Sequence, residues 1–345
     1  MMKAMLLHKV TNMDENREPL VLSEVPMPEP GFKEMLIKLS VCGVCHTELD
    51  EIEGRAMPAF FPIIPGHQGV GIVEICGKGC TKISPGDRVG VAWIFSACGK
   101  CHFCTSGREN LCGKFKATGR DANGAYAEYM VIGEDFAVKI PQELSDVHAA
   151  PLLCAGAIGY RSVRLAAPKE GNNIGLMGFG ASAHLVIKML LYLYGSPGIF
   201  VFSRTEEERR FAMECGATWS GDIGDRAPVM LNSIIDTTPA WKPVLESLRN
   251  LEKGGRLVIN AIRKENTDRD LLTGISYEDH LWWEKEIKSV ANITTKDVQE
   301  FLELSIKAGI RPTVTEYALE EANVALMEIK TKKIKGAKVL RIGVA

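Results

Sequence analysis

Residues 173–190 read Asn-Ile-Gly-Leu-Met-Gly-Phe-Gly-Ala-Ser-Ala-His-Leu-Val-Ile-Lys-Met-Leu. The apolar run 174–177 predicts a buried strand, and the apolar spacing over 183–194 predicts a helix. The turn between them fits the G-x-G-x-x-G/A pattern of a dinucleotide-binding turn. In such a turn the first glycine permits the tight bend, the second lets the backbone approach a pyrophosphate, and the third small residue keeps the helix close to the sheet. The residues expected to bind a cofactor here are Gly178, Gly180, Ala181 and Ala183. A tight turn without a ligand is the alternative interpretation.

The same alternation of strand and helix continues on the C-terminal side of this turn. Further strands are predicted at 199–202, 233–236 and 256–261, and helices at 206–215 and 244–251. Strands that alternate with helices predict a doubly wound parallel sheet, the Rossmann arrangement.

The N-terminal part of the chain has a different texture. Short β-branched runs at 35–39 and 69–75 are bounded by Gly and Pro, and 85–89 is typical of a turn that leads into a strand. These patterns predict a compact, mostly β domain. From about residue 293 a helix over 297–308 and a strand over 339–344 are expected to return to this first domain.

Composition narrows the class of protein. The chain has 345 residues, enough for two domains, with 46% hydrophobic residues, 24% charged residues and a formal net charge of −2. The chain has no basic tail that would indicate binding to nucleic acid or to an anionic membrane. The first ten residues lack an apolar stretch long enough for a signal peptide or a membrane span, so a cytoplasmic location is expected. In a reducing compartment, clustered cysteines indicate metal binding more often than disulfides.

Four of the ten cysteines lie in one short segment, 98–112: Cys98, Cys101, Cys104 and Cys112. Four thiolates in one loop can close a tetrahedral shell around zinc and leave no open position, so the expected role is structural. Unrelated thiols or two disulfides are the alternative. His102 lies inside the cluster and is expected to be a solvent-facing loop residue rather than a fifth ligand.

Three further residues stand apart: Cys45 in Gly-Val-Cys-His-Thr, His67 in Pro-Gly-His, and Cys154 in Leu-Cys-Ala-Gly. Each taken alone is compatible with an ordinary core cysteine or a hydrogen-bonded histidine. The spacing of these three residues along the chain does not by itself indicate a shared site.

These local sequences, with the four-cysteine loop between them and the dinucleotide turn after them, resemble the zinc-dependent medium-chain alcohol dehydrogenases over essentially the whole chain. The resemblance implies an α/β protein with a GroES-like, mostly β catalytic domain over 1–154 and 293–345. It implies a structural-zinc lobe over 94–115 and a Rossmann coenzyme domain over 155–292. It also implies that Cys45, His67 and Cys154 bind a catalytic zinc, giving two zinc ions per chain.

The resemblance assigns roles to residues beside the zinc cysteine. Thr47 is expected to receive the substrate proton, and His46 to lie near the cofactor pyrophosphate. Asp50 stands where many relatives have a histidine that passes the proton to solvent, which leaves the last relay step open. Glu48 is expected to orient His67, and Gln68 replaces the usual glutamate.

Two other positions follow from the resemblance. Trp93 matches a position that lines the substrate pocket of relatives, although it also fits an ordinary core aromatic. Relatives often have a basic residue near the C-terminus that meets the cofactor phosphates. Ala337 and Lys338 stand there, and that contact is not carried over.

The end of the second predicted strand bears on the choice of cofactor. NAD-binding sites usually place Asp or Glu there, to hold the ribose hydroxyls. This chain has Ser203, Arg204 and Thr205, which can bind a 2′-phosphate that an acidic group would repel. NADP(H) is therefore the predicted cofactor. The alternative is that Arg204 pairs with residues 206–208 and leaves NAD(H) acceptable.

The expected function is an NAD(P)-dependent alcohol dehydrogenase, or aldehyde reductase, acting on a small primary or secondary alcohol. Its alternatives are a polyol, sugar or cinnamyl-type alcohol dehydrogenase with the same zinc chemistry, and a non-catalytic protein that binds zinc and a nucleotide. A zinc ribbon that binds nucleic acid conflicts with the neutral charge. Relatives occur as dimers and tetramers, so a homo-oligomer without nucleic-acid or membrane partners is expected.

Overall fold

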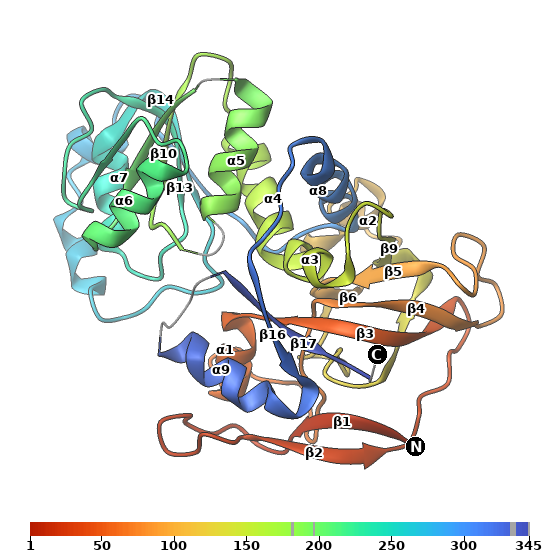
Figure 1. Cartoon of the computed structure of the whole chain (residues 1–345). Helices are drawn as coiled ribbons and strands as arrows, with labels where there is room; N and C mark the ends of the chain where they lie inside the picture. Colours follow the sequence, from red (N-terminus) through yellow and green to blue (C-terminus); the bar gives the residue numbers. More distant parts are fainter. Residues whose placement is uncertain (181–182, 196, 332–335, 344–345) are drawn as a thin grey trace. The chain divides into compact units, whose positions relative to one another are not determined.

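The computed structural model describes residues 1–180, 183–195, 197–331 and 336–343. The chain divides into two compact units (Figure 1). Unit 1 consists of Met1–Cys154, Asn292–Ile306 and Arg311–Ala345, and unit 2 of Ala155–Ala291 and Lys307–Ile310. Unit 1 is therefore discontinuous in sequence, with unit 2 inserted after Cys154.

Unit 2 is built on a six-stranded sheet in the order β12-β11-β10-β13-β14-β15, with every neighbouring pair parallel. Relative to the chain this is the order 3-2-1-4-5-6 of the doubly wound dinucleotide-binding fold. The strands are β10 (Asn173–Met177), β11 (Gly198–Phe202), β12 (Trp219–Gly221), β13 (Leu231–Asp236), β14 (Leu251–Ile259) and β15 (Glu286–Ser289).

Helices connect and cover these strands. They are α4 (Ala157–Ala166), α5 (Ala183–Tyr194), α6 (Glu206–Glu214) and α7 (Lys242–Asn250), with short turns η4 (Arg269–Gly274) and η5 (Tyr277–Leu281) before β15. Helix α6 packs on β11 and β12, whereas α7 packs on β10, β13 and β14. The helices bury an apolar layer against the sheet that includes Phe202, Ile234, Leu248 and Leu257.

Unit 1 is mostly β. Its main sheet runs β16-β17-β3-β4-β5-β9, and β8 pairs with β3 beside this path. Small sheets β1-β2 and β6-β7 complete it. The strands are β1 (Met2–Leu7), β2 (Leu20–Val25), β3 (Glu34–Val44), β4 (Gly69–Cys76), β5 (Arg88–Val91), β6 (Ile94–Ser96), β7 (Lys116–Ala117), β8 (Tyr129–Gly133), β9 (Ala137–Lys139), β16 (Val314–Ala318) and β17 (Ala337–Arg341).

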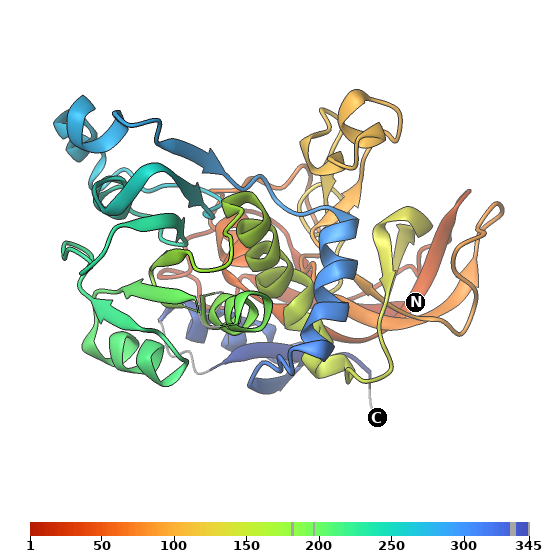
Figure 2. The same cartoon turned by 90° about the horizontal axis from the view of Figure 1, so that it is seen from above.

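The helices of unit 1 are short except α8. They are α1 (His46–Ile52), α2 (His102–Thr105), α3 (Asp146–Pro151), α8 (Thr295–Lys307) and α9 (Ala322–Lys330), with turns η1 (Glu109–Leu111), η2 (Glu134–Phe136), η3 (Leu152–Gly156) and η6 (Leu319–Glu321). One apolar core joins the main sheet to α1 and α9 through residues such as Met35, Ile37, Ile52 and Leu326. The loops between β6 and β7, residues 97–115, project as a lobe, light orange in Figure 2.

The α/β fold class is confirmed, and the strongly periodic elements lie close to their expected bounds. Two expectations need correction. Strand β14 begins at Leu251, directly after the end of helix α7, rather than at residue 256. The reason is that Leu251 already pairs with Leu231, ahead of a register shift. The last strand spans Ala337–Arg341 rather than 339–344, because its ladder with β3 ends at the pair of Arg341 and Val41. Residue 344 lies outside the described residues.

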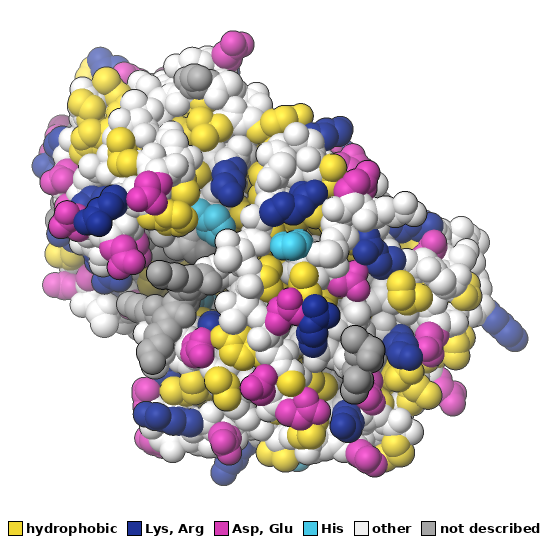
Figure 3. All heavy atoms as spheres, in the orientation of Figure 1, with side chains coloured by type: hydrophobic (Ala, Val, Ile, Leu, Met, Phe, Trp, Pro, Cys, Tyr) yellow, Lys and Arg dark blue, Asp and Glu magenta, His cyan; other side chains and the backbone are white. Residues whose placement is uncertain are grey.

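The surface carries no large field of one charge on the face in Figure 3, where acidic and basic side chains alternate. Within the described ranges, no helix combines the length and the apolar character that a membrane span requires.

Candidate metal centre and nucleotide turn

The sulfur atoms of Cys45 and Cys154 and a ring nitrogen of His67 come together in unit 1. These three donor atoms lie within 4.8 Å of one another. Cys45 Sγ lies 3.6 Å from His67 Nε2. Two thiols and an imidazole are a donor set that zinc prefers, and three protein ligands leave the fourth tetrahedral position for water or substrate.

Cys45 is placed by the start of helix α1. It is the N-cap residue, and its Sγ accepts the backbone N–H of Thr47 at 3.4 Å. Glu48 closes the reciprocal contact, since its Oε2 accepts the backbone N–H of Cys45 at 2.8 Å. This capping box fixes the cysteine at the end of strand β3.

His67 is fixed by the turn that precedes β4. Gly66 has a φ of +94°, and a Cβ there would lie 2.3 Å from the Tyr126 ring, so no other residue fits this turn. Glu48 Oε1 lies 2.7 Å from His67 Nδ1, and both side chains are buried. A carboxylate on the far nitrogen orients the ring so that Nε2 faces the cysteines.

Cys154 comes from a break in helical geometry. It lies in the π-helical turn η3 between α3 and α4. Such turns widen a helix locally and occur often at functional sites, because they turn a side chain away from the regular helical face. The chain is thereby able to present Cys154 to residues of α1 and the β4 turn.

Burial and mutual contact perturb the titration of this group. The pKa of Cys45 is raised well above its ordinary value by the Cys154 hydrogen bond, by burial and by Glu48. Burial alone lowers the pKa of His67, but Glu48 and Cys45 outweigh burial and raise it. Both shifts favour the protonated forms of Cys45 and His67, and metal binding at this site would displace those protons.

A second buried carboxylate, Glu51, escaped the sequence analysis. Its Oε1 accepts the indole N–H of Trp93 at 3.4 Å, and burial followed by the Glu48 charge raises its pKa to about 8. The Arg120 guanidinium lies 5.0 Å from the Trp93 ring centroid, and Phe115 packs at 5.8 Å. Trp93 is therefore half-buried, and its ring is fixed by contacts with these three side chains. The helical spacing from Glu48 was the only sequence signal for Glu51.

The other residues that the sequence singled out near Cys45 differ in burial and in their contacts. His46 is exposed, Thr47 is half-buried, and Gln68 is buried. The Asp50 carboxylate, also buried, accepts a hydrogen bond from Arg55 in an ion pair. Lys338 is bound to Tyr317 and Glu328 within unit 1.

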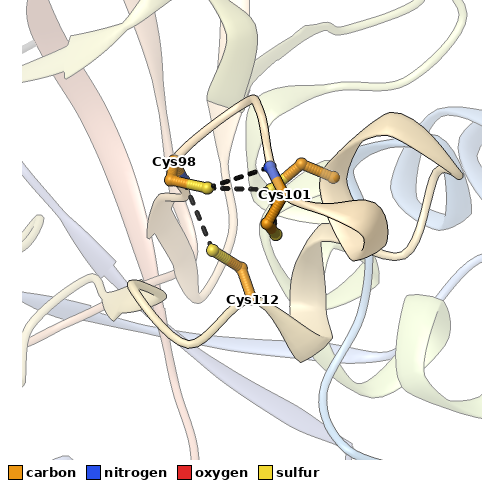
Figure 4. A group of neighbouring side chains, drawn as sticks. Cys98, Cys101 and Cys112 are labelled. Atoms are coloured by element: carbon orange, nitrogen blue, oxygen red, sulfur yellow. Dashed lines mark hydrogen bonds between the residues drawn. The ribbon is translucent and has the colours of Figure 1, made fainter.

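The four cysteines of the lobe converge. Their sulfur atoms lie within 4.8 Å of one another. Figure 4 shows the Cys98 and Cys112 sulfurs turned toward each other and toward Cys101. The sulfurs of Cys98 and Cys104 are 3.9 Å apart, and those of Cys101 and Cys104 are 3.6 Å apart. His102 is exposed and its Nε2 lies 2.8 Å from Arg108, away from the sulfur cluster.

Backbone amides prepare this loop for thiolates. The Cys101 N–H donates to Cys98 Sγ, and the N–H groups of Cys98 and Lys114 donate to Cys112 Sγ, at 3.3–3.4 Å. Such bonds favour the ionised sulfur. The backbone N–H groups of Lys100 and Cys101 lower the pKa of Cys98 to about 6, and those of Cys98 and Lys114 lower the pKa of Cys112. Burial and the neighbouring thiols raise the pKa of Cys104 to about 12. The loop fits a closed metal shell.

The dinucleotide turn lies at the carboxyl ends of the central strands of unit 2. Gly178 has a φ of +83°, and a Cβ there would lie 2.9 Å from Thr238. Among the described residues, no atom lies within 4 Å of where a Cβ on Gly180 would be, which leaves room for an approaching group. Ala183 is buried at the start of α5. Ala181 lies outside the described residues. The described part of the turn fits a bound pyrophosphate.

The side chains of Ser203 and Thr205 make hydrogen bonds to Glu208, whereas Arg204 does not. Ser203 is buried and its hydroxyl donates to Glu208. Thr205 caps helix α6, its hydroxyl oxygen accepting the Glu208 N–H at 3.2 Å. Arg204 is exposed and has no hydrogen bond or ion pair within the part of the chain that the structure describes.

Comparison with known proteins identifies relatives along the whole chain. A family model described as "Alcohol dehydrogenase GroES-like domain" matches residues 31–142. "Probable alcohol dehydrogenase AdhA" of Mycobacterium tuberculosis is 37% identical, over 99% of this chain and 97% of the relative. An alcohol dehydrogenase of Geobacillus stearothermophilus is 30% identical, over 97% and 99%.

A solved structure has the same fold. The crystal structure of CAD from Helicobacter pylori, complexed with NADP(H), aligns with a TM-score of 0.84 over 99% of this chain and 98% of that one. At 21% sequence identity, this similarity describes the fold alone.

Proposed function

Because the chain belongs to the zinc-dependent medium-chain alcohol dehydrogenase family, we propose that it transfers hydride reversibly between a small primary or secondary alcohol and a nicotinamide cofactor. The observation that supports this most strongly is the convergence of Cys45, His67 and Cys154 in unit 1. A regulator or structural protein of the same fold does not need an open three-ligand centre.

We assign the binding of a catalytic zinc to these three residues and of a structural zinc to Cys98, Cys101, Cys104 and Cys112. When bound at the open centre, zinc acts as a Lewis acid that makes an alcohol hydroxyl more acidic and an aldehyde carbonyl more electrophilic. Glu48 Oε1 holds His67 in the orientation in which Nε2 can bind metal.

We assign the transfer of the substrate proton to a residue of helix α1, and contact with the substrate to Trp93, between strands β5 and β6. We propose that the Thr47 hydroxyl oxygen accepts the substrate proton while its own proton passes on toward the cofactor ribose. We also propose that His46 contributes to binding the cofactor pyrophosphate. Trp93 is proposed to line the substrate pocket. Its ring is held by Glu51, Arg120 and Phe115, so it offers a flat wall that suits slim or flat alcohols.

For the cofactor we propose NADP(H), with NAD(H) as the alternative. The support is that Arg204 is exposed without an ion pair among the described residues. A guanidinium in that state is able to bind a 2′-phosphate. The Gly178–Gly180 turn is proposed to hold the pyrophosphate.

We further propose a homo-oligomer. The edge strand β15 of the unit 2 sheet has four exposed residues, and Ile287 on it is 47% exposed. Trp282 and Trp283, just before this strand, are also exposed. Apolar groups on an open sheet edge favour association. Sedimentation of Ile287→Lys beside the wild type tests this; a wild type that sediments as a monomer contradicts it.

The function is tested by butanal reduction with NADPH and with NADH in parallel, followed by nicotinamide absorbance. Wild-type turnover is expected, faster with NADPH. Cys154→Ser is expected to lose it, because serine is a poor zinc ligand. Cys215→Ser, in unit 2, is the matched control. Faster turnover with NADH contradicts the cofactor proposal alone. If no aldehyde or ketone in a panel, including sugar and cinnamyl types, is reduced with either cofactor, the proposal fails.

A further inference from the structure

The acidic group that the sequence lacks at the end of the second Rossmann strand is present in space. Strand β11 ends at Phe202, and the Phe202 carbonyl accepts the backbone N–H of Gly178 at 2.8 Å. Ser203 therefore follows directly beside the dinucleotide turn. Its hydroxyl donates to the carboxylate of Glu208, five residues further along the chain in helix α6.

Glu208 is held in this position from two sides. Its backbone N–H is fixed by the Thr205 cap at 3.2 Å, and its side chain by Ser203. The neighbouring acids of the same turn are directed elsewhere: Glu206 pairs with Arg210 at 3.5 Å, and Glu207 is exposed. Of the three acids at 206–208, Glu208 is the one whose side chain contacts the strand end, through the Ser203 hydroxyl.

The basic groups nearby do not neutralise this carboxylate. Arg209 donates to the Ser203 carbonyl at 2.7 Å and pairs with Asp222 at 3.4 Å. Arg204 is exposed without a partner in the described ranges. One free cation and one fixed anion thus flank the place where a dinucleotide-binding fold holds the adenosine ribose.

We propose that Glu208 is a cofactor-discriminating residue, whose carboxylate accepts from the ribose hydroxyls of NAD(H) and repels the 2′-phosphate of NADP(H). This rests on the proposed function, because it requires that unit 2 binds a nicotinamide dinucleotide. Arg204 acts in the opposite direction. The preference of the enzyme is then the outcome of two opposed charges, and Glu208 limits the advantage that Arg204 gives to NADP(H).

The test measures dissociation constants for NADPH and NADH by fluorescence titration, together with 2′,5′-ADP and 5′-ADP, which carry no nicotinamide. Glu208→Gln retains an acceptor for Ser203 but removes the charge. It is expected to shift the NADPH-to-NADH affinity ratio toward NADPH by about tenfold or more, since the charge is partly screened by solvent. The ratio for the two ADP fragments is expected to shift in the same direction.

Two further variants complete the design. Glu207→Gln makes the same change of net charge one residue away, and is expected to leave both ratios within about twofold of wild type. Arg204→Ala is expected to shift the ratios toward NADH and 5′-ADP. The inference is overturned if Glu208→Gln leaves the ratios unchanged, or moves them no further than Glu207→Gln. Wild-type protein that binds neither dinucleotide overturns the proposed function and this inference with it.

Discussion

At the scale of single residues, Glu48 connects the fold of helix α1 to the metal centre. One oxygen caps the helix through the Cys45 N–H, and the other holds His67 Nδ1. Glu48→Gln keeps the cap acceptor but weakens the hold on the imidazole. We expect zinc affinity at the open centre to fall by about 10- to 100-fold, measured by competition with a chelator of known affinity.

The matched control for Glu48→Gln is Glu51→Gln. Glu51 is equally buried on the same helix but bonds Trp93 rather than His67. Its substitution is expected to leave zinc affinity unchanged. Equal losses in the two variants would mean that burial of a carboxylate, and not contact with His67, matters for zinc.

Asp50 is the candidate for the last step of proton release. Its carboxylate is tied to Arg55 in an ion pair. We therefore expect Asp50→Ala to lower the free energy of unfolding by about 1–2 kcal/mol and to leave the pH profile of kcat unchanged. A displaced pH profile would instead place Asp50 on the proton route.

The three converging residues were predictable as candidates, but the residues that support them were only partly so. Cys45, His67 and Cys154 lie in short local sequences that resemble those of a known family. Glu51 and Glu208 carry no such signal, since a glutamate on a helix is ordinary. Their importance depends on which side chain the fold brings opposite them: Trp93 for Glu51 and Ser203 for Glu208.

At the scale of elements, the four-cysteine lobe has few apolar residues of its own and relies on its sulfur cluster. Cys104→Ser is expected to lower the zinc content by about one ion per chain and to lower Tm, as followed by metal analysis and thermal unfolding. Cys215→Ser is the control. A lobe variant that keeps its full zinc content contradicts the structural-zinc assignment.

Strand β17 is tied to helix α9 and strand β16 by one buried lysine. Lys338 Nζ donates to Tyr317 at 2.7 Å and to Glu328. Burial alone lowers the pKa of Lys338, but the bonds to Glu328 and Tyr317 outweigh it, so the pKa lies above its ordinary 10.5. A raised pKa in the folded state stabilises the protein below the unfolded value and loses that contribution as pH rises through the folded one.

Lys338→Met is therefore expected to lower the free energy of unfolding by about 1–3 kcal/mol at pH 8. The difference from wild type should stay constant between pH 7 and 9 and shrink above about pH 10.5. Urea titrations at pH 8 and pH 11 measure both. A difference that does not shrink at pH 11 would assign the loss to packing rather than to charge.

The elements that were predicted well are those with strong periodicity. Strand β10, helix α5 and strand β13 are apolar and buried, and burial is what periodicity reports. Strands β15 and β16 were missed because most of their residues are exposed, and β12 because it has only three residues. Such strands are defined by pairing with a neighbour, which a local pattern does not contain.

At the scale of the whole molecule, chain order and spatial order differ. Strand β17, from the C-terminal end of the chain, pairs with β3 from the N-terminal part, and the inserted segment forms its own parallel sheet. The change from short β segments in the N-terminal part to alternating strands and helices from residue 173 onward indicated this organisation in the sequence. The register of the return was not predictable, because β17 is fixed by its partners β3 and β16 rather than by its own residues.

The central claim is that this chain is an enzyme whose activity depends on metal held by Cys45, His67 and Cys154. The most direct measurement is the rate of butanal reduction with NADPH and NADH while zinc is removed by a strong chelator and then restored. We predict that the rate falls to background as zinc leaves the open centre and recovers when zinc is added. A rate that persists after all bound zinc has been removed would contradict the account.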